Sequence, residues 1–172
     1  MPKKSVCLAA IGISILALFW LASQSTAKPA PYWRLPVSGE LHIIREFSPP
    51  SPNWLPGHRG IDLSARSGTT VKAPAAGVIT FADQLAGRGV VVINHGGVRS
   101  TYEPVSASVQ VGDVVLPGEV IGKVNCGIGH CCKNLRARCL HWGLLRGDKY
   151  LNPLGRLDLQ IVLLPGAGLT FS

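Results

Sequence analysis

No stretch between residues 69 and 124 carries the apolar period of an amphipathic helix. Short apolar runs separated by Gly and Pro stand there instead, which is the pattern of strands and turns. This excludes a helical bundle and predicts an all-β fold with little helix, an antiparallel β sandwich or barrel-like sheet. Residues 152–157 are compatible with one helical turn. The expected strands are 41–47, 60–65, 69–73, 78–82, 90–94, 100–105, 114–116, 120–124, 140–145 and 159–164.

Charged residues are scarce at 15% of the chain, and the acidic ones are the fewer, with 9 Asp and Glu against 17 Lys and Arg. Together with 20 Gly and 13 Pro in 172 residues, this composition fits one domain rich in turns. The basic residues are scattered and form no recognisable nucleic-acid-binding motif, so we expect no nucleic-acid partner. An exported basic domain is instead attracted to the anionic polymers of a cell envelope.

The N-terminal segment has the organisation of an export signal. Lys3 and Lys4 precede an uncharged apolar run over residues 6–22, and Ser25-Thr26-Ala27 offers a small-residue cleavage site. The alternative is an uncleaved anchor, although about 17 apolar residues lies at the short end of what spans a bilayer. The protein is therefore expected outside the cytoplasm, in the bacterial cell envelope or the medium. The expected division is signal 1–27, linker 28–36, folded domain 37–165 and tail 166–172.

Four cysteines follow the signal, namely Cys126, Cys131, Cys132 and Cys139. In an oxidising compartment they are expected to form disulfides rather than to remain free thiols. Adjacent Cys131 and Cys132 are poorly placed to bond each other. We therefore expect Cys139 to pair with one of them and Cys126 with the other. Metal ligation by Cys139 is the alternative.

A first polar cluster lies in Pro56-Gly57-His58-Arg59-Gly60-Ile61-Asp62-Leu63. In an extended strand His58 and Asp62 would be about 13 Å apart, which is too far to share one small ligand. If they converge on a metal ion, the backbone is expected to bend at Gly57 or Gly60, where positive φ costs little. The alternative is a surface loop that leads into a buried strand, with both side chains merely polar.

A second polar cluster is Cys139-Leu140-His141-Trp142-Gly143. In a strand, Cys139 and His141 share one face while Leu140 and Trp142 pack on the other. His141 can then join His58 and Asp62. Two imidazoles, one carboxylate and an open fourth position form the pattern of a catalytic zinc site.

Taken in order, these segments resemble the lysostaphin-type (LytM-like) zinc metallopeptidases over about Leu41 to Leu154. No single piece is specific, but their order and spacing together are. The matching residues are Phe47, His58-Arg59-Gly60-Ile61-Asp62, Gly68-Thr69-Thr70-Val71-Lys72-Ala73-Pro74, Gly77-Val78-Ile79, Asn94-His95-Gly96-Gly97, Thr101-Tyr102, Val111-Gly112-Asp113, Pro117-Gly118-Glu119, Ile121-Gly122 and Leu140-His141-Trp142-Gly143.

The resemblance implies a duplicated-hybrid-motif β fold with one zinc ion per domain, held by His58, Asp62 and His141. It also implies hydrolysis of the stem or cross-bridge peptides of bacterial peptidoglycan. Two positions depart from the family. Cys139 replaces the first histidine of its His-x-His motif, and Glu103, in Thr101-Tyr102-Glu103-Pro104, stands where a second active-site histidine is usual.

These departures leave two interpretations open. In the first, the protein is an exported zinc-dependent endopeptidase of peptidoglycan in which Glu103 acts as the catalytic general base. In the second, it is an inactive relative that binds peptidoglycan or regulates another wall hydrolase. For Glu103 itself, the alternative is a solvated carboxylate or a pair with Arg99. A biotinyl- or lipoyl-like carrier is disfavoured, because Lys72 lies within an expected strand rather than at a hairpin tip.

Overall fold

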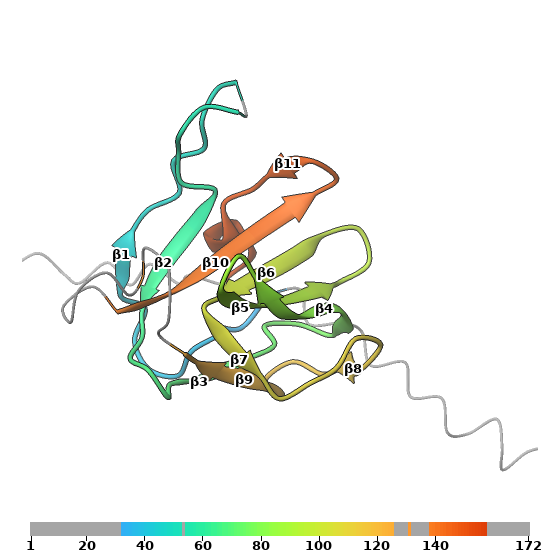
Figure 1. The fold of residues 1–172 in the computed structure, drawn as a ribbon. Coiled ribbons are helices and arrows are strands. Elements are labelled where there is room, and N and C mark those ends of the chain that lie inside the picture. Colours follow the sequence, from blue (N-terminus) through green and yellow to red (C-terminus); the bar gives the residue numbers. More distant parts are fainter. Residues whose placement is uncertain (1–31, 53, 126–130, 132–137, 158–172) are drawn as a thin grey trace, which may run out of the picture.

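The computed structural model describes residues 32–52, 54–125, 131 and 138–157, whose fold is shown in Figure 1. Their regular structure is antiparallel β, as the sequence predicts, with one 3-10 turn, η2, over Pro153–Arg156. The strands are β1 (Ile43–Arg45), β2 (Gly60–Ser64), β3 (Thr70–Lys72), β4 (Gly77–Leu85), β5 (Arg88–Asn94), β6 (Arg99–Glu103), β7 (Val105–Ala107), β8 (Val114–Val115), β9 (Val120–Val124), β10 (Cys139–Arg146) and β11 (Lys149–Tyr150).

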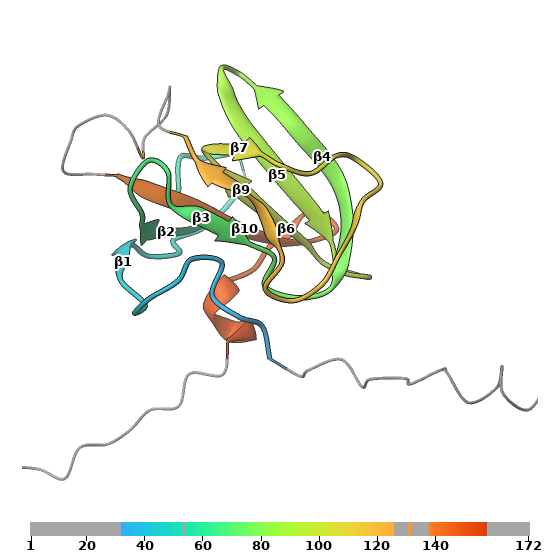
Figure 2. The ribbon, with the colours of Figure 1, turned by 90° about the horizontal axis from the view of Figure 1, so that it is seen from below.

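The strands form two sheets. The larger has the order β1-β2-β10-β6-β5-β4-β8, with β11 paired to β10, and the smaller has the order β3-β9-β7. Seen in Figure 2, the small sheet covers one face of the large one. The predicted sandwich is therefore confirmed. The strand expected over residues 159–164 lies outside the described residues.

The core lies between the two sheets. Leu63, Tyr102 and Trp142 of the large sheet are at most 1% exposed and belong to one cluster with Val71 and Ile121 of the small sheet. Burying one such side chain stabilises a fold by about 1.5 to 3 kcal/mol. Because successive strand residues point to opposite faces, the residues between these apolar ones point away from the small sheet. That outer face of the large sheet carries the polar clusters.

The strand expected over residues 100–105 is two strands in different sheets. β6 ends at Glu103 in the large sheet, and β7 begins at Val105 in the small one. Pro104 between them has no amide hydrogen to continue a ladder. The chain therefore changes sheets directly after Glu103, which places this residue at the end of β6.

The strands expected over 78–82 and 90–94 extend toward each other and form a hairpin. Leu85 pairs with Arg88, and the two residues between them, Ala86 and Gly87, have φ of 51° and 81°. Positive φ at both loop residues is typical of the tight type I′ turn. The sequence gives little sign of it, because alanine rarely adopts positive φ. The hairpin sets the position of Arg88 at the start of β5.

Residues 32–36, part of the segment expected to be a linker, lie against the domain. The amide of Trp33 donates to the carbonyl of Arg156 at 2.8 Å, and the amide of Arg34 donates to the carbonyl of Pro74 at 2.9 Å. The Trp33 ring centroid lies 6.4 Å from that of Trp142. The expected signal, residues 1–27, and tail, residues 166–172, lie outside the described part. Among the described residues there is no helix of the length and apolarity that crossing a membrane requires.

A partly buried chain of hydrogen bonds connects β5 and β6 to the loop before β4. His95 Nδ1 donates to the carbonyl of Ala76 at 2.8 Å, so its Nε2, 2.7 Å from Ser100 Oγ, accepts. The Tyr102 hydroxyl donates to the same Ser100 oxygen at 2.8 Å. Burial raises the pKa of Tyr102, so the hydroxyl remains a donor, and burial lowers the pKa of His95. Each polar group in this chain therefore depends on the next one for its hydrogen-bond partner.

Removing the buried hydroxyl should destabilise the fold. Tyr102→Phe deprives Ser100 of its donor, and we expect the free energy of unfolding to fall by about 1 to 3 kcal/mol, measured by urea denaturation. Tyr32→Phe, at a side chain that is 53% exposed, is the matched control and should change little. Equal effects of the two substitutions would contradict a structural role for the buried network.

Acid should weaken the fold through His95. Because its folded-state pKa is lowered, the stabilisation is present above the unfolded-state value of about 6.5 and is lost as the pH falls through the folded value. Urea denaturation at a series of pH values from about 8 to 5 should show this decline. The slope should be smaller for His95→Asn and unchanged for His42→Asn, a control at an exposed position. An unchanged slope in His95→Asn would mean that other groups produce it.

Candidate metal centre

A row of polar side chains crosses the outer face of the large sheet. His141 of β10 pairs directly with Asp62 of β2 on one side and with Glu103 of β6 on the other. Residues paired in this way point to the same face, with Cβ atoms about 5 Å apart. The register therefore gathers three residues from distant parts of the sequence, and all three were singled out from the sequence.

His58 reaches this row from the segment that precedes β2. Its backbone forms an antiparallel bridge with Ser48, through hydrogen bonds of 2.8 and 2.9 Å. The expected bend by positive φ at Gly57 or Gly60 is wrong, since neither glycine has positive φ. Gly60 is needed instead because a side chain does not fit at this position. A Cβ on Gly60 would lie 2.7 Å from Nε2 of His141 and 2.5 Å from the carbonyl oxygen of Trp142.

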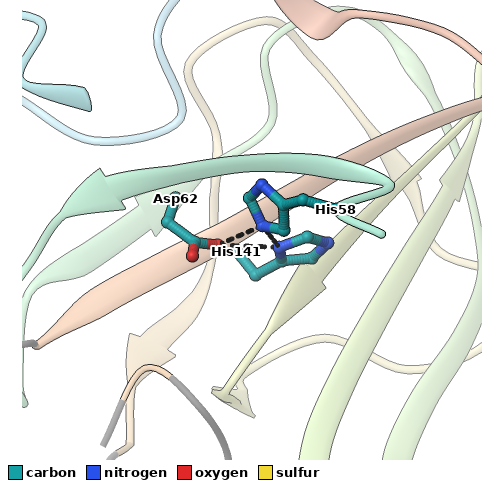
Figure 3. A group of neighbouring side chains, drawn as sticks. All are labelled: His58, Asp62 and His141. Atoms are coloured by element: carbon teal, nitrogen blue, oxygen red, sulfur yellow. Dashed lines mark hydrogen bonds and ion pairs between the residues drawn. The ribbon is translucent and has the colours of Figure 1, made fainter. Parts of the chain in front are cut away.

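Figure 3 shows the ligand cluster, which we define as His58, Asp62 and His141. Asp62 Oδ1 lies 2.9 Å from His58 Nε2 and 2.8 Å from His141 Nδ1, and the two nitrogens are 3.1 Å apart. Ligand atoms that surround zinc tetrahedrally at 2.0 to 2.2 Å are separated by about 3.3 Å. The sequence therefore singled out side chains that do converge, and their spacing is close to that of a zinc site.

The hydrogen bonds of His58 identify the ring nitrogen that faces the cluster as an acceptor. Its Nδ1 lies 2.6 Å from the carbonyl oxygen of Glu46, which can only accept, so Nδ1 carries the hydrogen. In the neutral ring, Nε2 then presents a lone pair toward the carboxylate of Asp62, which is also an acceptor. Two acceptors do not bond each other directly, so either a bound cation or a proton on Nε2 lies between them. The donor set thus fits a metal ion, and a carbonyl behind a ligating histidine orients such ligands.

The burial of His58 and Asp62 also favours a bound cation. His58 is 4% exposed and Asp62 is 2% exposed. A buried carboxylate is costly unless a positive charge or hydrogen-bond donors compensate it. A dication held by the ligand cluster would compensate the charge of Asp62. Ligation by these three residues stays a prediction.

Glu103 lies beside the ligand cluster and is held by an arginine that the sequence did not point to. Arg88 Nε donates to Glu103 Oε2 at 2.6 Å. The expected alternative pair with Arg99 is not formed, since Arg99 donates to the carbonyl of Gly147 at 3.2 Å. Arg88 was missed because its position depends on the hairpin loop at Ala86 and Gly87. The role of Glu103 as general base stays a prediction.

Cys139 is bonded to Cys131, one of the two partners expected for it. Cys126 and Cys132, the expected second pair, lie outside the described residues. The bonded sulfurs lie close to the ligand cluster, because one carboxylate oxygen of Asp62 and both Sγ atoms fall within 4.8 Å of one another. Where the family resemblance implies a histidine, this chain therefore has a disulfide, which neither takes nor gives a proton.

The family model for peptidase family M23 matches residues 56–153. The chain belongs to peptidase family M23. This segment contains the ligand cluster, Glu103 and the disulfide, and the fold and the LytM-type resemblance inferred from the sequence are thereby confirmed. The NMR structure of lysostaphin shares the fold with a TM-score of 0.54 and 25% identity, over 69% of this chain and 52% of that one.

Two curated relatives differ in how much of this M23 chain they match. An uncharacterised protein of Mycobacterium tuberculosis is 42% identical over 151 residues, which is 84% of this chain and 59% of that protein. The DD-carboxypeptidase/endopeptidase Mpg of Neisseria meningitidis is 48% identical over 69 residues, 39% of this chain and 16% of that protein. The chain thus spans less than two thirds of the length of the relatives it matches.

The space at Gly60 gives a test of the ligand cluster. In Gly60→Ala the new methyl group collides with the His141 ring and with the carbonyl oxygen of Trp142, and we expect zinc affinity to fall at least about tenfold in isothermal titration calorimetry. Gly155→Ala is the control, because a Cβ at Gly155 meets no atom within 4 Å. Equal zinc affinities of the two variants would count against His141 as a ligand.

Proposed function

We propose that this M23 protein is an exported, zinc-dependent endopeptidase that hydrolyses peptide bonds in bacterial peptidoglycan. The observation that carries the proposal is the convergence of three acceptor atoms, from His58, Asp62 and His141, on the outer face of the sheet. The signal-like segment over residues 1–27 supports export. The partial match to a DD-carboxypeptidase/endopeptidase supports peptide-bond hydrolysis.

In this proposal His58, Asp62 and His141 hold one zinc ion. When bound, the ion supplies Lewis-acid chemistry, polarising the scissile carbonyl and acidifying water. The chain's own contribution is orientation. The Glu46 carbonyl fixes the His58 ring, and Gly60 leaves room for the His141 ring. Three protein ligands leave a fourth position open, which distinguishes catalytic from structural zinc sites.

We assign to Glu103 the role of taking the proton from the attacking water. It is the cross-strand neighbour of His141, and its side chain is 19% exposed. Arg88 holds one carboxylate oxygen, Oε2, through its Nε. The other oxygen, Oε1, is the one we assign to the proton. Arg88 thereby acts as a positioning residue for the proposed base.

Exposed apolar side chains in the segment before His58 offer a surface for the substrate. Trp54 is 82% exposed and Leu55 is 43% exposed, a few residues before His58. Figure 1 shows the segment between β1 and β2 extending away from both sheets. An extended peptide lying across the outer face would contact this segment. Without Lys3 and Lys4 of the signal, 15 basic and 9 acidic residues give a formal charge of +6, which adds attraction to anionic envelope polymers.

Two observations favour the second candidate function, an inactive relative that binds peptidoglycan or regulates another wall hydrolase. The family's histidine is replaced by a disulfide-bonded Cys139, and the remaining carboxylate of Glu103 is engaged by Arg88. A binding protein needs the outer face but no general base. The two candidates therefore differ in whether peptide bonds are broken.

Mass spectrometry separates the candidates. The protein is incubated with purified peptidoglycan and zinc, beside His141→Ala and a chelator-treated sample. The endopeptidase predicts new peptide termini among the soluble fragments in the first sample only. Zinc binding and sedimentation with peptidoglycan without any fragments would reject the peptidase and favour the binding protein.

A second substitution tests the assignment of the base. Glu103→Gln keeps the size of the side chain but removes its basicity, so turnover should fall by about 10² to 10⁴ while zinc content by atomic absorption stays unchanged. Glu40→Gln, at an exposed position, is the matched control. Full activity of Glu103→Gln would require another base.

A further inference from the structure

The disulfide and the ligand cluster share a neighbour, Asp62. Cys139 lies two residues before His141 on the same face of β10, and it pairs with Ser64, two residues after Asp62. Cys131 is 1% exposed, Cys139 3% and Asp62 2%. Their ligand atoms lie within 4.8 Å of one another. Sulfur and oxygen donors are thus gathered in one buried place on the Asp62 side of the ligand cluster.

We propose that reduction of this disulfide creates a second metal site, in which the Sγ atoms of Cys131 and Cys139 and a carboxylate oxygen of Asp62 hold a thiophilic divalent cation such as Zn²⁺. This ligand set contains two sulfur atoms, which the ligand cluster lacks, and it forms only after the disulfide is reduced. Its formation does not depend on peptidase activity, because only metal binding is involved.

The three donors start close together. Two thiolates that bind one zinc ion at about 2.3 Å lie about 3.8 Å apart, and a thiolate and a carboxylate oxygen about 3.5 Å apart. The sulfurs and the Asp62 oxygen lie within 4.8 Å of one another, and the two sulfurs, bonded in the disulfide, move apart to bind an ion. The Cα atoms of the cysteines are 4.8 Å apart. Once the Sγ–Sγ bond is broken, side-chain rotation is sufficient to place the sulfurs around an ion.

The chemistry balances with a dithiol as reductant. The dithiol gives two electrons and two protons to the bond between Cys131 and Cys139 and becomes a disulfide itself, which leaves two thiols in the protein. On metal binding the thiols release their protons to solvent and ligate as thiolates. The two thiolates alone balance the charge of the dication, the Asp62 carboxylate leaves one excess negative charge, and soft thiolate ligands select zinc over hard cations.

The second site affects the ligand cluster through Asp62. Because the Asp62 carboxylate belongs to both ligand sets, an ion held by the two thiolates competes with an ion of the ligand cluster for this ligand. Oxidation of Cys131 and Cys139 removes the competing thiolates and leaves Asp62 to His58 and His141.

Cobalt(II) is the probe, because thiolate ligation gives a ligand-to-metal charge-transfer absorption that imidazole and carboxylate ligands lack. The test protein is the full chain with Cys7→Ser, Cys126→Ser and Cys132→Ser. The matched control carries Cys7→Ser, Cys131→Ser and Cys139→Ser. Each is reduced with a dithiol, which is then removed without oxygen, and each is also measured after oxidation.

The charge-transfer band is expected only in the reduced test protein, with zinc bound at least about tenfold more tightly than in its oxidised form. No band in the reduced test protein, or an equal band in the control, would overturn the proposal.

A measurement on the unsubstituted chain covers the case in which the variants do not fold. After reduction, bound zinc should slow alkylation of Cys131 and Cys139 by iodoacetamide, as peptide mass spectrometry reports residue by residue. Asp62→Asn should weaken that protection. Equal alkylation of both cysteines with and without zinc would refute the site even if the protein cleaves peptidoglycan.

Discussion

The antiparallel pairing of β10 with β2 and β6 is the constraint on which the outer face of this protein depends. It fixes Asp62, Glu103 and His141 in one row. Along the chain, Glu103 follows Asp62 by 41 positions and His141 follows Glu103 by 38 positions. A shift of the register by one residue would turn His141 into the core and Trp142 out of it. The apolar residues of β10 therefore hold the site in register, because Leu140, Trp142 and Leu144 can be buried in one arrangement only.

Around this row, the chain supplies positioning groups that carry no chemistry themselves. The Glu46 carbonyl sets the tautomer of His58. Gly60 has no side chain, which leaves space for the His141 ring over β2. Arg88 forms an ion pair with Glu103. None of these groups is a ligand. Each reduces the number of orientations open to a ligand or to the proposed base, and pre-organisation of this kind is what separates a site from a polar surface.

The disulfide is where this chain departs most from the pattern of its family. The family resemblance implies a histidine at position 139, where this chain has a disulfide-bonded cysteine. The disulfide places two sulfur atoms beside the Asp62 carboxylate. In the second metal site that we propose, the redox state of Cys131 and Cys139 decides whether these sulfurs bind a metal ion.

The sequence by itself determined the all-β class, most strand positions and the three converging residues, because period-2 patterning, turn residues and the His58, Asp62 and His141 motifs are local signals. Only the tertiary structure decided the partner of Glu103 and the pairing of Cys139, since a long-range contact leaves no trace in the spacing of residues. It also decided why Gly60 is a glycine. The sequence suggested a bend, but a Cβ at this position would collide with the carbonyl oxygen of Trp142 and with the ring of His141. Both atoms belong to the neighbouring strand, so these contacts exist only once the sheet has formed.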